Sequence, residues 1–199
     1  MHFLGALTSI TLMVSLPFTI LSNDFPNNYI MKNMQDTAKG YMEIFTADGK
    51  LAYCFTKKPN GSSQDKMTTI LETGSLQKIF ALSSSNDDCL ARGRSVYAQL
   101  EEIANNVWHF NFWDYASGAR QYYKLERNST KKGGMIYRVS RGKTSVLVGR
   151  LRRQSRNNAW LDPVNGVSTF TLSTINGAPV TELATLMFYV WQKHHDCGM

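Results

Sequence analysis

The sequence predicts an all-β chain with one helix, a closed antiparallel β-barrel of about twelve strands around a buried hydrophobic C-terminal helix. Two observations predict it. From Tyr41 to Ile175, short segments with a hydrophobic period of two follow one another and are separated by turn residues. One segment near 178–195, APVTELATLMFYVWQKHH, then carries apolar side chains on every side. A helix of that kind must be surrounded, and a closed barrel surrounds it and leaves no free sheet edge.

The ends of this helix are marked by residues that suit them. Pro179 and Glu182 fit the first turn, and Lys193 with two histidines fits the last turn, before Gly198. The apolar run is about ten residues long, which is short of the roughly twenty that cross a bilayer. We therefore expect a core helix in which four side chains are nearly inaccessible, namely Leu183, Leu186, Met187 and Val190.

The strands are expected wherever apolar and polar residues alternate between turn signals. Asp48-Gly49 is typical of a tight hairpin turn, and KKPNGSSQD (57–65) reads as a loop. Alternation in 107–114 places Trp108, Phe110 and Phe112 on one face and His109, Asn111 and Trp113 on the other. In chain order the expected strands are 41–45, 51–56, 67–72, 76–83, 96–103, 107–114, 120–127, 135–141, 144–153 and 167–175.

The N-terminal segment has two interpretations. Residues 1–22 are uncharged from Phe3 to Leu21 and predict a signal peptide, which places the domain at 23–199 and the protein in the secretory pathway or outside the cell. The alternative makes the segment the first strand of the fold, in a cytoplasmic protein at the membrane periphery. Only in the first case are the sequons glycosylated, at Asn60 and Asn128. Three cysteines, Cys54, Cys89 and Cys197, define no disulfide framework.

The positive charge is concentrated in one third of the chain. Residues 120–156 contain twelve Lys or Arg and one acid, a net charge of +11, whereas the remainder carries −4. A basic third on a slightly acidic body indicates an anionic partner, or else strand faces that are simply solvated.

Within this third, the strand 144–153 is the best candidate for a binding surface. Strand alternation places Val146, Val148, Arg150 and Arg152 on one face, and Leu147, Gly149, Leu151 and Arg153 on the other. Two guanidinium groups at i and i+2 lie about 7 Å apart, a spacing that suits phosphate oxygens. These arginines are expected to point outward. The predicted anion-binding residues are Arg138, Arg141, Lys143, Arg150, Arg152, Arg153 and Arg156.

The order of elements resembles the Tubby C-terminal-like superfamily, which includes Tubby, the phospholipid scramblases and the plant LURP-one-related proteins. The similar stretches are MEIFTADGKLAYCF, VLVGRLRR and the helix LATLMFYVWQKHHD, between about Tyr29 and Asp196. The chain looks like a small, divergent member. The resemblance implies a twelve-stranded barrel threaded by a hydrophobic helix, and binding of phosphoinositide-like head groups by Lys and Arg rather than catalysis.

Other chemistry is less well supported by the sequence. Tyr122, Tyr123 and Tyr137 alternate with basic residues, as in nucleic-acid binding, but no nucleic-acid motif accompanies them. His194-His195-Asp196-Cys197 has metal-ligand types at adjacent helical positions, which cannot all face one ion. The prediction is a non-catalytic module without cofactor or metal that binds an anionic phospholipid or membrane surface. The alternative is a secreted module that binds a protein partner.

Overall fold

The computed structural model describes residues 25–33, 41–60, 63–73, 78–85, 92–94, 98–104, 106–129 and 133–197. Between residues 57 and 98, and at 102–104 and 196–197, only the backbone is described. Strands precede one helix, with these bounds: β1 Asn27–Lys32, β2 Tyr41–Thr46, β3 Leu51–Asn60, β4 Ser63–Thr73, β5 Lys78–Ser85, β6 Arg92–Arg94, β7 Ala98–Ala104, β8 Val107–Asp114, β9 Ala119–Arg127, β10 Gly133–Val139, β11 Val146–Arg156, β12 Val167–Thr174 and α1 Val180–Cys197.

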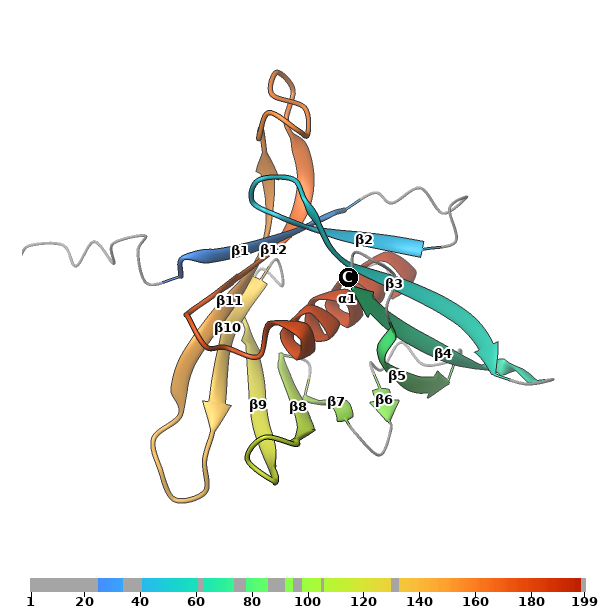
Figure 1. Cartoon of the computed structure of the whole chain (residues 1–199), viewed down its shortest axis with the longest axis vertical. Helices are drawn as coiled ribbons and strands as arrows, with labels where there is room; N and C mark the ends of the chain where they lie inside the picture. The colour runs from blue at the N-terminus through green and yellow to red at the C-terminus, as the bar shows by residue number, and fades with distance from the viewer. Residues whose placement is uncertain are drawn as a thin grey trace, which may run out of the picture.

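All strand pairs are antiparallel, and most join strands that are consecutive in the chain. Hydrogen-bonded neighbours follow the order β1-β12-β11-β10-β9-β8-β7-β6-β5-β4-β3-β2, and β1 also pairs with β2. Figure 1 shows α1 in the middle of the view, with strands on both sides of it. The predicted all-β architecture, an antiparallel sheet with one C-terminal helix packed against it, is confirmed in this form.

The helix lies in the core on every side, as its composition predicts. All side chains from Leu183 to Trp191 are buried, so the expectation for Leu183, Leu186, Met187 and Val190 is confirmed. Phe188 stacks on Phe55 of β3 with ring centroids 4.4 Å apart. The helix begins two residues later than predicted because Pro179 accepts its first backbone hydrogen bond, from the N–H of Leu183.

The predicted β2–β3 hairpin turn is confirmed at Asp48-Gly49. Gly49 has a φ of 85°, and the indole of Trp160 covers it so closely that a Cβ would lie 2.6 Å from a ring atom. The hydroxyl of Thr46 donates to the carboxylate of Asp48, and this bond, with the nearby Lys50 ammonium, lowers the pKa of Asp48 to about 2. The turn is therefore fixed by local polar bonds and by the ring of Trp160, a residue that is far away in the sequence.

Alternation in β8 is confirmed residue by residue. Trp108, Phe110 and Phe112 are buried in the core, while His109 and Trp113 on the opposite face are exposed. Because the buried row faces α1 and the core cluster, the exposed row defines the outer face of the sheet in this region.

In the region from 57 to 94, one expectation is wrong and one strand was not predicted. The segment 57–65 is not a loop, since β3 and β4 continue through most of it and Pro59 lies opposite Met67. The short strand β6, Arg92–Arg94, was not expected. Pairing with a neighbouring strand satisfies backbone N–H and C=O groups whatever the side chains, so a polar composition does not exclude a strand.

Several expectations lie outside the described residues. The interpretation of residues 1–22 is one, and the structure begins instead with Phe25, just before β1. Cys89 is another, and the side chain of Cys197 is likewise undescribed, whereas Cys54 is buried in β3. Asn128 lies on the exposed stretch after β9, and Asn60 ends β3. The disulfide state and glycosylation stay open.

Candidate anion-binding site

The seven predicted basic residues lie on β10, on the β10–β11 turn and on β11, but they do not form one surface. The turn and the strand before it carry an exposed group, which we call the hairpin patch. The outer side of β11 carries a second group, the strand face. The hairpin patch consists of Arg138, Arg141 and Lys143, and the strand face consists of Arg150 and Arg152, with Arg153 and Arg156 placed elsewhere.

The hairpin patch is built by a short turn. The backbone N–H of Lys143 donates to the C=O of Ser140 at 3.1 Å, and Gly142 takes a positive φ of 69°. All three cations of the patch are exposed. The first residues of β11 continue the exposed surface with apolar groups, because Val146 is 46% and Leu147 is 38% exposed. Charged and apolar side chains therefore meet at one end of the sheet.

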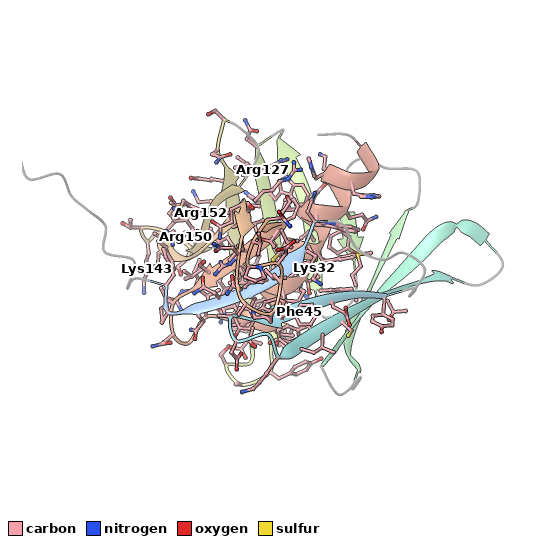
Figure 2. The ribbon with its side chains drawn as sticks, turned by 90° about the horizontal axis from the view of Figure 1, so that it is seen from above. Lys32, Phe45, Arg127, Lys143, Arg150 and Arg152 are labelled. Carbon is pink, nitrogen blue, oxygen red and sulfur yellow. The ribbon has the colours of Figure 1, made fainter. Side chains whose placement is uncertain are left out.

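The strand face lies in the middle of β11. Arg150 is opposite Ser173 and Arg152 is opposite Thr171 on β12, so the two arginines follow each other on the same side of the strand. Figure 2 shows them close together, with Lys143 farther out on the same side of the view. The guanidinium of Arg150 also lies 5.1 Å from the centre of the Phe25 ring, which holds one face of it against the protein. Arg152 is exposed.

The prediction that Val148 shares a face with Arg150 and Arg152 is wrong. The register of β10 and β11 shifts between Ile136 and Tyr137, where an extra residue of β11 forms a bulge. Val148 is that residue, and it is buried in the core with an exposed fraction of 3%. A bulge reverses the alternation on one side of it, so the face could not be read through the whole strand from the period of two.

Arg153 is placed on the core side of β11, so the expectation that it points outward is wrong. It follows the buried Leu151 by two positions and lies opposite Phe170, whose ring is 5.9 Å from that of His194. Burial lowers the pKa of His194, and the positive charge of Arg153, followed by those of Arg127 and His195, lowers it further. The C-terminal end of α1 therefore lies close to several cations on the core side of the sheet.

Arg156 is on the outer side of the sheet but is engaged by the fold. Its Nε donates to Asn158 at 3.0 Å, and one terminal nitrogen donates to the hydroxyl of Thr171 at 3.4 Å. Burial lowers the pKa of Arg156. Asn158 in turn donates to the carbonyl of Ala47 at 3.4 Å, so this arginine helps to attach the β11–β12 connection to the β2–β3 turn.

Sequence reasoning missed two features of the strand face. The first is a row of buried hydroxyl groups on the outer side of β12, made by Thr169, Thr171 and Ser173. The alternation of VSTFTLST predicts the strand and the common face of these hydroxyl groups, but it does not predict that this face is buried. The second is Lys32, which lies opposite Thr169 on β1 and adds a cation across the sheet. Its position follows from long-range pairing, which no local pattern predicts.

Exposed aromatic residues lie near the hairpin patch. Trp113 is 38% and Tyr115 is 77% exposed at the β8–β9 turn. In an antiparallel succession of β8, β9, β10 and β11, this turn and the β10–β11 turn are at the same end of the sheet. Figure 1 shows both turns at the bottom of the view.

The described residues hold neither a metal-ligand cluster nor a membrane-spanning helix. In the described ranges, no three His, Cys, Asp or Glu side chains lie together as metal ligands would. The helix described there does not combine the length and apolar character needed to cross a membrane. Comparison with known proteins found no family model, no curated protein and no solved structure that matches this chain.

Proposed function

We propose that this protein is a non-catalytic binding module that holds anionic phospholipid head groups, or a similar polyanion, on the hairpin patch and the strand face. The observation that carries the proposal is the composition of the hairpin patch. Arg138, Arg141 and Lys143 are exposed next to exposed Val146 and Leu147. Cations attract the negative surface of a membrane, and adjacent apolar groups enter its interfacial layer.

The strand face adds a second contact of different character. Arg150 and Arg152 project from the same side of one strand, and their backbone spacing of about 7 Å allows two guanidinium groups to grip one phosphate or two neighbouring ones. The ring of Phe25 restricts Arg150, so less side-chain freedom is lost when an anion binds. Head-group recognition is the task that fits this pair.

The proposal extends to the architecture and to the family. Closure of the sheet into a barrel of about twelve strands around α1 is supported by β1, which pairs with both β2 and β12. It depends on the pairing of β5 with β6, at Ser83 and Arg94. Slow amide exchange in β6 would support closure, and exchange as fast as in a peptide would contradict it. The likeness to the Tubby C-terminal-like superfamily also stays a prediction.

Vesicle binding tests the function directly. The full chain should sediment with vesicles that contain acidic phospholipid, and binding should fall steeply as salt rises to physiological concentration. Replacing Arg138, Arg141 and Lys143 together by Gln, or Arg150 and Arg152 together, should weaken binding by about 1 kcal/mol per charge near the surface, or about fivefold each. Lys50→Gln is the matched control, because it removes an exposed cation from the β2–β3 turn.

Two results would refute the proposal. One is equal binding of the parent protein to acidic and neutral vesicles. The other is unchanged binding of both multiple variants to acidic vesicles. Association that does not depend on salt would favour a protein partner held by exposed apolar residues such as Tyr115, and N-terminal sequencing of the mature protein would decide whether that partner is extracellular.

A further inference from the structure

A surface cavity of about 480 Å³ lies on the outer side of β7, β8, β9 and β10. Strand register explains its position. Gln99 of β7 is opposite Asn111 of β8, Asn111 is opposite Tyr122 of β9, and Tyr122 is opposite Val139 of β10. These residues form one row across the sheet, on the face away from the core. Arg141, from the turn after β10, adds a cation to the lining.

The row offers a flat apolar surface together with polar groups at fixed positions. Tyr122 is 51% exposed, so much of its surface is accessible although the residue lies in the middle of a strand. The amide oxygen of Asn111 accepts a hydrogen bond from Arg120, and this bond fixes the orientation of the amide. Its NH₂ group is then the part that can donate to a ligand. An aromatic surface beside one oriented amide is suited to a planar ring that carries an acceptor.

Charge fixes which way such a ligand lies. Arg141 lines the cavity on the side of the β10–β11 turn, whereas Glu101, two residues beyond Gln99 on β7, lines it farther along the strands. An anionic substituent is therefore attracted to the Arg141 end of the cavity. The volume lies within the range of about 300–1,000 Å³ that small-molecule sites usually have.

We propose that this cavity binds a small planar aromatic ligand with one anionic substituent, its ring on Tyr122 and its anion at Arg141. This site does not depend on the proposed membrane function. It shares only Arg141 with the hairpin patch, and Tyr122 belongs to neither the hairpin patch nor the strand face.

Two dyes test the proposal on the full chain. Anilinonaphthalene sulfonate is an aromatic anion with a planar naphthalene ring, and phenylnaphthylamine has the same rings without the charge. The parent protein should bind the sulfonate at one site, detected as an increase in dye fluorescence. Tyr122→Ala should weaken both dyes about tenfold, since stacking on one aromatic side chain is worth about 1–3 kcal/mol. Arg141→Gln should weaken the sulfonate about fivefold and leave the neutral dye within about twofold.

Two control variants change residues outside the cavity and outside both proposed binding surfaces. Tyr115→Ala removes a more exposed ring, and Lys50→Gln removes an exposed cation from the β2–β3 turn, and neither residue lines the cavity. Both should bind the sulfonate as the parent does. The proposal is overturned if the parent binds neither dye, if Tyr122→Ala and Arg141→Gln bind like the parent, or if the controls lose as much affinity as they do. The double variant Arg150→Gln/Arg152→Gln should keep the dye site even if it loses vesicle binding, so the two proposals fail separately.

Discussion

Replacing Phe188 by Ala should destabilise the protein more than almost any other single change in the helix. Phe188 is fully buried, stacks on Phe55 at 4.4 Å and lies 6.1 Å from the ring of Trp191. Removing a buried phenyl ring typically costs about 3–5 kcal/mol, as lost transfer free energy plus the cavity that remains. The stacked pair with Phe55 adds about 0.5–1.5 kcal/mol, which places the expected loss at the upper end of that range.

Urea unfolding followed by circular dichroism measures this loss, with an unchanged slope as evidence that the unfolded state is the same. For a chain of this length, the loss should lower the melting temperature by about 6–20 °C. Phe188→Leu, which keeps most of the volume, should cost clearly less than Phe188→Ala. Val164→Ala, at a side chain that is 87% exposed, should change stability by less than about 0.5 kcal/mol. A loss below about 1 kcal/mol for Phe188→Ala would refute the central position of α1.

Three further predictions concern the helix end and the turns. The pKa of His194 is lowered below 6.5 in the folded state, so the unfolded state takes up the proton first, and stability should fall as pH drops below 6.5. His194→Gln should flatten that dependence, and equal slopes in parent and variant would contradict it. Gly49→Ala should cost about 1–3 kcal/mol more than Gly118→Ala, because both have positive φ but only at Gly49 would the added Cβ lie 2.6 Å from a ring atom of Trp160. Equal losses in calorimetry would exclude the indole contact. Trp191→Phe removes an indole N–H that donates to the carbonyl of Asn33 at 2.8 Å, and should cost about 1–2 kcal/mol in urea unfolding. A change near zero would mean that water replaces this bond.

The elements that the sequence predicted well are those whose local pattern and tertiary environment agree. The helix is apolar on all sides and is buried on all sides, so composition alone located it within two residues. In β8 the alternation continues without a bulge, and Trp108 and His109 fall on the predicted faces. In both cases the polarity of each side chain agrees with its burial in the structure.

The basic residues were harder to place because the charge of a side chain does not indicate which face of a strand it occupies. Strand alternation separates Arg153 from Arg150 and Arg152, but it does not say which of the two faces is turned toward the core, where Arg153 lies opposite Phe170. The bulge then removes Val148 from the face of Arg150 and Arg152. A bulge depends on the pairing register of two strands, so the sequence of one strand alone does not predict it. The sequence could therefore predict the proposed binding surface as a region but not as a set of side chains.

The same separation changes what the net charge of residues 120–156 means for binding. Arg153 faces the core, and Arg156 donates hydrogen bonds to Asn158 and Thr171. Lys124 forms an ion pair with Glu126 at 2.6 Å, and Arg120 donates to Asn111. These cations already serve the fold, and Arg127 is buried. Among the cations of this stretch that the structure describes, an anion held as proposed would therefore meet chiefly the hairpin patch and the strand face. The salt dependence of vesicle binding should accordingly be that of about five charges, well below the +11 counted along the sequence.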